Sequence, residues 1–275
     1  MRKFKSDGFL SFRHFRISNN YTKIRQGEMM MKLHEQTVLV TGASRGVGEE
    51  LVKAFVKEGA NVVLNYYKSE EKAQRLAQNL GSQVIALQAD IRNQQEVQQM
   101  VEKAKQYFHT PITTIVNNAL IDFEFNPLTQ KNVFELQWTD YNKQLEGTIK
   151  GALNSIQACI EDMKELEFGR IINIGTNLFQ HPVVAYHEYT TAKAALLGFT
   201  RNMAKELGEY GVTVNMMSGG LLKQTDASKV TTAEVFQLIE TTTTLQRVTT
   251  PKELAEVALF FASPWGSAIT GQNLV

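Results

Sequence analysis

The sequence predicts an α/β fold, namely a doubly wound parallel sheet of about seven strands with helices on both faces in three layers. Short apolar runs rich in β-branched residues alternate with longer segments of helical periodicity. The runs are apolar throughout, which is typical of parallel strands covered by helices on each side. A glycine-rich turn joins the first run to the first helical segment. Because the alternation continues without repeats or linkers, we expect residues 33–275 to form a single domain.

The elements follow in order from the spacing of the apolar residues. The predicted strands are residues 37–41, 61–66, 83–88, 112–116, 170–174, 212–216 and a short one at 272–275. The predicted helices are residues 47–58, 72–80, 93–108, 138–166, 189–210 and 251–262. In the first helix, for example, Val47, Leu51 and Phe55 recur at helical spacing, and Ser69 is the predicted N-cap of the second.

Composition and charge exclude several classes of protein. The 275-residue chain has a net charge of +1 and 43% hydrophobic residues, so we expect no nucleic-acid binding and no membrane binding. Cys159 is the only cysteine, which excludes an internal disulfide and favours a reducing, cytoplasmic location. The sequence contains no pattern of ligands that indicates a metal site.

The first 32 residues differ in charge from the rest, because eight Lys or Arg residues stand against two acidic ones. We interpret residues 1–32 as a basic N-terminal extension that is either disordered or the product of a mis-assigned start. Residues 26–28, just ahead of three methionines at 29–31, resemble a translated ribosome-binding site. An organellar transit peptide and a basic tail for an acidic partner are the alternatives.

Residues 41–48, with the sequence TGASRGVG, form the turn after the first strand. A pyrophosphate binds to backbone N–H groups at a helix N-terminus, where side chains would block it. Gly42 permits the tight turn, Gly46 allows a ligand to approach and Gly48 lets helix and strand pack closely. This context favours a Rossmann-type dinucleotide site. The same residues also fit G-x-S-x-G, in which Ser44 would be an esterase nucleophile, although that motif leaves Gly48 unexplained.

The segment after the second strand favours NADP(H) over NAD(H). An NAD site usually carries an acidic residue about 20 residues after the glycines, and residues 64–69, LNYYKS, contain none. Arg45 and Lys68 offer the positive charge that a 2′-phosphate requires. The alternative is that both are ordinary surface charges.

Tyr189 and Lys193 are four residues apart on a predicted helix and therefore on one face. The ordinary pKa of a phenol is about 10, and a neighbouring ammonium group lowers it by stabilising the phenolate. A tyrosine brought towards neutrality in this way protonates a carbonyl oxygen as hydride reaches the carbon. A half-buried tyrosine beside a solvated lysine is the alternative.

Together these motifs resemble the short-chain dehydrogenase/reductase family over about residues 35–275. The turn at 41–48 is similar to the cofactor turn of the family, and Asp90-Ile91 to its adenine contact. Asn117-Asn118-Ala119 and the pair Tyr189 and Lys193 are similar to its central and catalytic motifs. The likeness is strongest to bacterial 3-oxoacyl-[acyl-carrier-protein] reductases, which implies an NADPH-dependent homo-oligomer, a dimer or tetramer, of fatty-acid synthesis.

The resemblance implies hydride transfer between NADP(H) and a ketone, either small or bound to acyl-carrier protein, most simply a 3-oxoacyl thioester. The implied catalytic residues are Thr176, Tyr189, Lys193 and Thr148. The implied cofactor-binding residues are Gly42, Ser44, Arg45, Gly46, Val47, Gly48, Tyr66, Lys68, Ser69, Asp90, Ile91, Asn117, Ala119, Tyr189, Lys193, Gly219, Gly220 and Leu221. The implied substrate residues are Leu120, Phe123, Leu178, Phe179 and Tyr186.

The chain also departs from the family pattern. Thr176 stands where the family has serine, Thr148 where it has asparagine and Leu120 where it has glycine. The turn at 218–220 lacks the family's proline, and the chain stops before the tail that helps to build a tetramer. These departures leave open two further functions: a non-catalytic or weakly active NADP(H)-binding protein, and a reductase of another small ketone or alcohol.

Overall fold

The computed structural model describes residues 31–126, 128–223, 225 and 231–275. Residues 31–275 form one compact unit. The basic segment predicted at 1–32 lies outside the described residues as far as position 30, and its interpretation stays a prediction.

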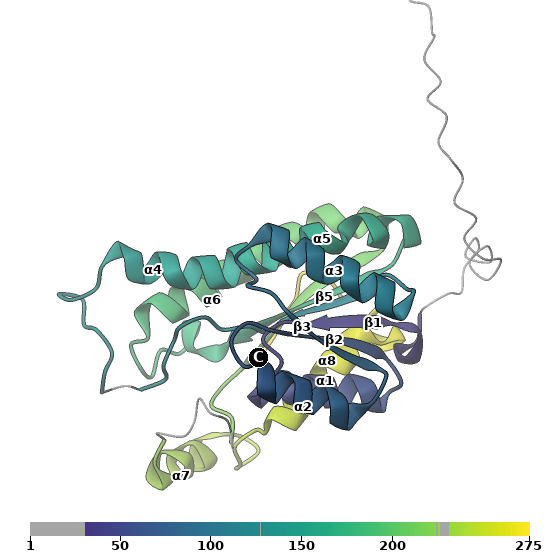
Figure 1. The fold of residues 1–275 in the computed structure, drawn as a ribbon. Helices are drawn as coiled ribbons and strands as arrows, with labels where there is room; N and C mark the ends of the chain where they lie inside the picture. The colour runs from purple at the N-terminus through teal and green to yellow at the C-terminus, as the bar shows by residue number, and fades with distance from the viewer. Residues whose placement is uncertain (1–30, 127, 224, 226–230) are drawn as a thin grey trace, which may run out of the picture. The chain divides into compact units, whose positions relative to one another are not determined.

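A parallel sheet of seven strands forms the centre of the fold (Figure 1). The strands are β1 (Thr37–Val40), β2 (Asn61–Tyr66), β3 (Val84–Gln88), β4 (Thr114–Asn117), β5 (Gly169–Thr176), β6 (Val212–Gly219) and β7 (Asn273–Leu274). Their order is β3-β2-β1-β4-β5-β6-β7, and every neighbouring pair is parallel. The predicted doubly wound sheet is confirmed. Its order reverses between β1 and β4, where open α/β sheets bind their ligands.

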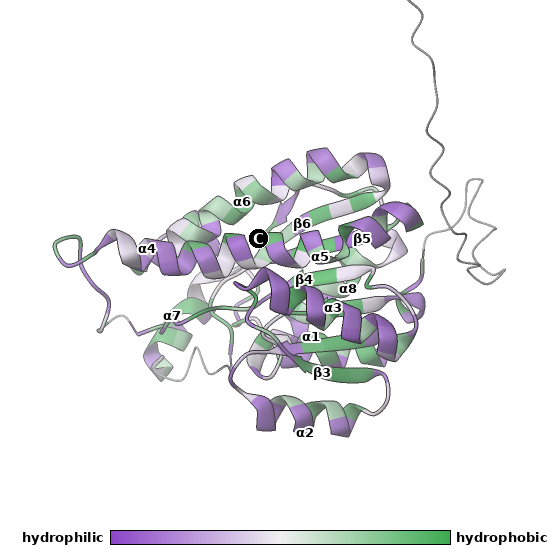
Figure 2. Cartoon of the chain, turned by 45° about the horizontal axis from the view of Figure 1, so that its top comes forward, coloured by the Kyte–Doolittle hydropathy of each residue, from purple (hydrophilic) through white to green (hydrophobic). Residues whose placement is uncertain are grey.

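Helices cover both faces of the sheet and make the three layers. On one face lie α1 (Gly46–Lys57), α2 (Glu70–Leu80) and α8 (Pro251–Ala262). On the other lie α3 (Gln94–Phe108), α5 (Gly151–Leu166) and α6 (His187–Leu207). Figure 2 shows hydrophobic residues concentrated on the strands, whereas α3 is largely hydrophilic on its outer side.

Alternate side chains of each strand enter different core clusters, as the pleat of a strand requires. Val38 and Val40 of β1 pack with α1 and α8, while Leu39 between them packs with α3 and α5. All three are fully buried. Burial on both faces explains why the strands of this sequence are apolar without alternation.

The structure differs from the sequence prediction in two helices. The helix predicted at 138–166 is divided into α4 (Trp138–Leu145), a π-helical turn η2 (Glu146–Lys150) and α5. A further helix, α7 (Ala233–Thr242), lies in a segment for which no helix was predicted. None of the residues of α7 is buried, although its apolar residues at 235, 236, 238 and 239 recur at helical spacing. Single-turn helices complete the fold at η1 (Leu33–Glu35), η3 (Asn177–Phe179), η4 (Gly208–Tyr210) and η6 (Pro264–Gly266).

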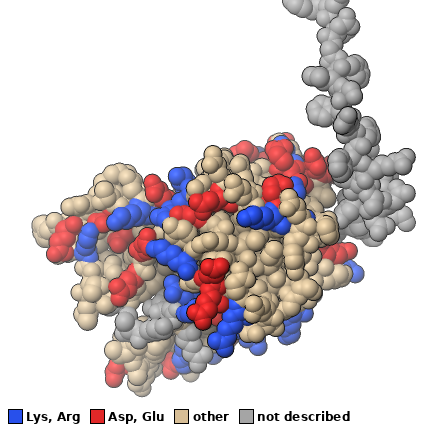
Figure 3. All heavy atoms as spheres, in the orientation of Figure 1, with Lys and Arg blue, Asp and Glu red and all other residues tan. Residues whose placement is uncertain are grey.

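The visible surface carries interspersed basic and acidic side chains (Figure 3). Within the described residues, no helix is both long enough and apolar enough to cross a membrane. The same residues contain no group of three or more His, Cys, Asp or Glu side chains arranged to hold a metal ion.

A buried chain of hydrogen bonds ties α6 to the centre of the sheet. Asn117 donates to Asn173 Oδ1 over 2.8 Å, and Asn173 donates to Thr200 Oγ1 over 2.9 Å. Thr200 in turn donates to the Leu196 carbonyl over 2.7 Å. Asn173 and Thr200 are fully buried, so each group depends on its neighbour for a partner.

We expect Thr200→Val to lower the free energy of unfolding by about 1–3 kcal/mol, because it leaves the buried Asn173 amide without its acceptor. Thr200→Ser keeps the hydroxyl and loses one buried methyl group, so we expect a loss of ~0.8 kcal/mol. Urea denaturation of both variants checks this. A valine variant as stable as the serine variant would contradict the assigned role.

Candidate active site

The structure brings the four predicted catalytic residues to the carboxyl end of β5. Tyr189 and Lys193 lie one turn apart on α6, and only 7% and 4% of their surfaces are exposed. Thr176 is the last residue of β5 and is also buried. Thr148 is buried in the π-helical turn η2. Side chains from α6, β5 and η2 therefore meet in one place.

Hydrogen bonds fix Thr176 and Lys193 relative to β5. Lys193 Nζ donates to the Ile174 carbonyl over 2.7 Å. The Thr176 hydroxyl accepts from the Leu178 N–H over 3.3 Å and caps the short helix η3. It also lies within hydrogen-bonding reach of the Tyr189 hydroxyl. The arrangement presents two hydroxyl groups side by side with a buried amine nearby.

Burial, and not the lysine, dominates the pKa of Tyr189. Desolvation raises the pKa of the phenol to about 12, and the hydrogen bond with Thr176 opposes this rise. Desolvation also lowers the pKa of Lys193 to about 8. The lowering of the Tyr189 pKa by Lys193, expected from the sequence, is absent from this structure. In this structure Lys193 Nζ is bound to the Ile174 carbonyl and lies 5.9 Å from the centre of the Tyr189 ring.

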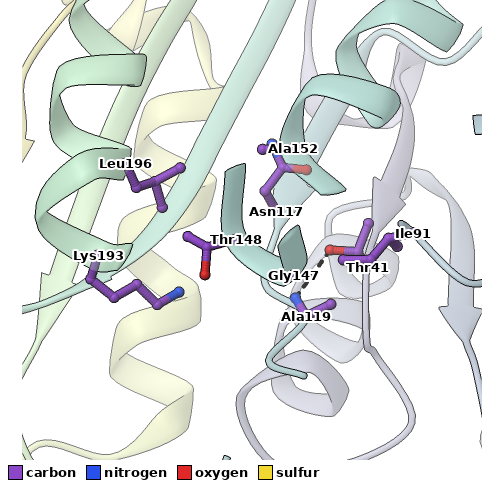
Figure 4. A pocket seen from close by; sticks show the side chains of 9 residues that line it. All are labelled: Thr41, Ile91, Asn117, Ala119, Gly147, Thr148, Ala152, Lys193 and Leu196. Atoms are coloured by element: carbon purple, nitrogen blue, oxygen red, sulfur yellow. Dashed lines mark hydrogen bonds between the residues drawn. The ribbon is translucent and has the colours of Figure 1, made fainter. Parts of the chain in front are cut away.

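A small cavity lies between Lys193 and Thr148. Its volume is about 10 Å³, roughly the space that one water molecule needs. Asn117, Ala119 and Thr41 also line it. Figure 4 shows the Thr148 hydroxyl and the Lys193 amine pointing into the same space. The π-helical turn carries Thr148 to this position, and such turns are often found at functional sites.

Aromatic rings cover the phenol of Tyr189. Phe123 is stacked on the Tyr189 ring with centroids 4.8 Å apart and an angle of 24° between the planes. Phe125 meets the same ring edge to face at 5.0 Å. Tyr186 packs edge to face against both phenylalanines. We call Phe123 and Phe125 the aromatic cover, because both pack on the Tyr189 ring.

The other predicted substrate residues lie apart from this cluster. Phe179 packs beside the small cluster of Ala152, Leu196 and Met216. Leu178 is half-buried in η3, and Leu120 is 37% exposed after β4. The structure therefore groups Phe123 and Tyr186 at the phenol, together with Phe125, and distributes the remaining three around it.

The glycine turn after β1 has the shape that a dinucleotide pyrophosphate requires. Gly46 has a φ of 58°, and a Cβ atom built on it would meet no atom within 4 Å. At Gly48, by contrast, a Cβ atom would lie 2.6 Å from the Gly42 carbonyl oxygen. Arg45, the N-cap of α1, gives the helix no side-chain cap, so the helix N-terminus faces open space beside Gly46. The residues of the turn therefore fit the pyrophosphate of a dinucleotide.

Residues absent from the predicted set hold this turn in place. Asn118 donates to the carbonyls of Thr41 and Gly42. The Thr41 hydroxyl accepts from the Ala119 N–H, as Figure 4 shows. Asn65 accepts from the Gly42 N–H. The signal for Asn65 was its polar side chain near the end of an otherwise buried, apolar strand.

The residues predicted for the adenosine end divide into two groups. Asp90 lies after β3, and a bidentate Arg92 guanidinium holds the pKa of its carboxyl below the ordinary range. Lys68 is exposed after β2. Tyr66, in contrast, packs in the hydrophobic core, so only its backbone remains for a ligand. Ser69 occupies the N-cap of α2 without capping it through its side chain.

The remaining predicted positions lie around the same crevice. Ile91 lines the cavity beside Lys193 and accepts a hydrogen bond from Asn154. Gly219 pairs with Thr176 across β5 and β6, and Gly220 lies beside the Asn177 side chain. Leu221 is half-buried after β6.

Ser44, the nucleophile of the rival esterase interpretation, is buried in the turn after β1. Among the described residues it makes no hydrogen bond to a histidine. The arrangement that an esterase requires is therefore not formed around it.

Comparisons with known proteins agree with this fold. Residues 42–275 match the family model described as enoyl-(acyl carrier protein) reductase. The 3-oxoacyl-[acyl-carrier-protein] reductase of Synechocystis is 32% identical, with 89% of this chain and 96% of the relative covered. The corresponding reductase of Staphylococcus aureus is 30% identical, with 87% and 95% covered.

Two solved structures extend the comparison. The 3-ketoacyl-(acyl-carrier-protein) reductase from Brucella melitensis, complexed with NADH, has a TM-score of 0.79 at 26% identity and covers 88% of this chain and 97% of its own. A blue fluorescent protein from a metagenomic library, in complex with NADPH, has a TM-score of 0.76 at 29% identity and covers 89% and 97%.

We expect the free energy of unfolding of the wild type to rise with pH, and we expect Lys193→Met to abolish this rise. The folded-state pKa of Lys193 is about 8, below its ordinary value of 10.5, so the unfolded chain binds more protons between these values and wild-type stability rises there. Relative to the variant, the wild type should gain about 2 kcal/mol between pH 8 and pH 10. Urea denaturation at several pH values measures this. Parallel curves for the two proteins would contradict the buried amine.

Proposed function

The chain belongs to the short-chain dehydrogenase/reductase family, and on this premise we propose that it is an NADPH-dependent reductase of a ketone, with 3-oxoacyl thioesters as the substrate class. The convergence of the Tyr189 and Thr176 hydroxyls with Lys193 beside the glycine turn is the observation that carries the proposal. A nicotinamide cofactor bound at that turn supplies the hydride. The reaction class is an oxidoreductase acting on CH–OH and C=O groups.

Tyr189 serves as the acid in this scheme. The burial that raises its pKa to about 12 keeps the phenol protonated at neutral pH, and ketone reduction needs a proton donor at the developing alkoxide. Thr176 supplies a second hydroxyl to orient the carbonyl oxygen, as a serine would. Because threonine is β-branched, its χ1 angle is more restricted than that of serine.

Lys193 and Thr148 take the supporting roles. Lys193 would hold the nicotinamide ribose of the cofactor through its buried amine. The cavity between Lys193 and Thr148 has a size and polar lining that suit a water-mediated return of the proton. The Thr148 hydroxyl stands there in place of an amide, so we expect the return step to limit turnover.

Charge at the adenosine end supports NADP(H) as the cofactor. Arg45 in the glycine turn and Lys68 after β2 carry the positive charge that a 2′-phosphate requires, and the loop after β2 offers no carboxylate to repel a phosphate. The names of the relatives support acyl-carrier-protein-bound ketones as substrates, and the aromatic cover suits an apolar chain.

A homo-oligomer, either a dimer or a tetramer, is part of the proposal. Val133, Phe134 and Trp138 near the start of α4 are 69%, 95% and 69% exposed. Large apolar side chains grouped in this way commonly mark a protein interface. The buried, free thiol of Cys159, the only cysteine of the chain, supports a cytoplasmic location.

We expect Tyr189→Phe to lower NADPH oxidation with acetoacetyl-CoA at least ~100-fold, because the proton donor is removed. NADPH should bind the variant about as tightly as the wild type. Absorbance of NADPH over a panel of ketones measures turnover, and calorimetry measures binding. Tight NADPH binding by a wild type that turns over no ketone would favour a non-catalytic binding protein. Ester hydrolysis lost in Ser44→Ala would favour the esterase.

We expect Lys68→Ala to lower kcat/KM for NADPH about tenfold, because a charge-assisted contact with the 2′-phosphate is lost. The value for NADH should be unchanged. Lys72→Ala, which removes an exposed lysine of α2, is the matched control and should affect neither cofactor. Equal losses with NADPH and NADH would argue against recognition of the phosphate by Lys68.

A further inference from the structure

An ion pair crosses the cofactor crevice from one strand end to another. Lys68 follows β2 and Asp122 follows β4, and Lys68 Nζ lies 3.6 Å from Asp122 Oδ1. In the sheet, β1 lies between β2 and β4. The pair therefore spans the carboxyl end of β1, where the glycine turn begins.

Asp122 also interacts with a second cation, Arg92, at this end of the sheet. Its charge raises the pKa of Arg92, together with the larger effect of the hydrogen bond to Asp90. Lys68 Nζ and the Arg92 guanidinium lie 5.5 and 5.8 Å from the centre of the Tyr67 ring. Two cations thus flank one ring, and the carboxylate of Asp122 is an anion near both. The 2′-phosphate of a bound NADP(H) would bind the same two cations, Lys68 and Arg92.

The backbone at Asp122 connects this anion to the active site. Asp122 has a φ of 44°, a left-handed conformation that aspartate and asparagine tolerate better than most residues. The next residue, Phe123, is stacked on Tyr189, and Phe125 packs on the same ring. A movement of Asp122 away from Lys68 is therefore transmitted within one residue to the aromatic cover.

We infer that Asp122 occupies the place of the 2′-phosphate within the chain, so that binding of the phosphate at Lys68 and Arg92 displaces Asp122 and moves the aromatic cover away from Tyr189. The inference rests on the proposed NADP(H) site and adds Arg92 and Asp122 to it. Lys68 and Asp122 are 71% and 59% exposed, and a pair this exposed changes an equilibrium about fivefold at most. A phosphate with about two negative charges replaces it readily.

Asp122→Asn tests the competition, because asparagine keeps the size and the left-handed backbone and removes only the charge. The probes are adenosine 2′,5′-bisphosphate and adenosine 5′-monophosphate, which differ by the 2′-phosphate. By calorimetry, the variant should bind the bisphosphate about three- to fivefold more tightly than the wild type and the monophosphate equally. Glu124→Gln removes one charge from the same loop and is the matched control, with no change expected for either probe.

Hydrogen exchange tests the coupling to the aromatic cover. In the wild type, the bisphosphate should accelerate amide exchange in residues 119–126, whereas the monophosphate should leave it unchanged. In Asp122→Asn, exchange there should be fast without any probe. Equal bisphosphate affinity of wild type and variant, or exchange unaffected by the bisphosphate, would overturn the inference. If the wild type binds both probes equally, the NADP(H) preference itself fails, which is a separate result.

Discussion

Burial of the polar face of α6 against the end of β5 is the constraint on which the site depends. Lys193 Nζ donates a hydrogen bond to the Ile174 carbonyl, and Thr200 completes the chain of bonds through Asn173 to Asn117. A buried lysine and a buried amide are costly unless their hydrogen bonds are made. The same bonds that satisfy these groups also set the position of Tyr189 relative to Thr176, so the stability of the fold and the geometry of the site have one origin.

The crevice joins two regions that are far apart in the sequence. Because the sheet order reverses between β1 and β4, the ends of β2, β1, β4 and β5 adjoin in space. Charged residues gather at the β2 and β3 ends, and aromatic residues gather at the β4 and β5 ends. The loop after β4 belongs to both regions, since Asp122 faces Lys68 while Phe123 covers Tyr189.

The threonines at 148 and 176 illustrate how a site tolerates substitution. Thr176 keeps the hydroxyl of the family's serine, and its extra methyl group restricts the rotamer. Thr148 instead replaces an amide with a hydroxyl, in the lining of the cavity beside Lys193. In the proposed mechanism, the rate therefore depends on how easily protons are returned to Tyr189.

Most of the fold followed from the sequence, because apolar periodicity reports burial directly. The strands from β1 to β6 and the helix Pro251–Ala262 were predicted within a few residues. The turn at 41–48, Tyr189 and Lys193 were also identified, since backbone conformation and helical spacing are local properties. The helix α7 was missed although its apolar residues recur at helical spacing. The break at η2 was missed because a π-helical turn leaves no compositional signal.

The sequence alone therefore determined which strands and helices form, that they alternate around a parallel sheet, and which residues carry reactive groups. Only the tertiary structure decided how those groups affect each other. Whether an amine lowers the pKa of a phenol depends on distance and desolvation, and here Lys193 is bound to a strand carbonyl while Phe123 lies on the Tyr189 ring. These contacts join residues separated by many positions in the chain, and local sequence patterns carry no record of them.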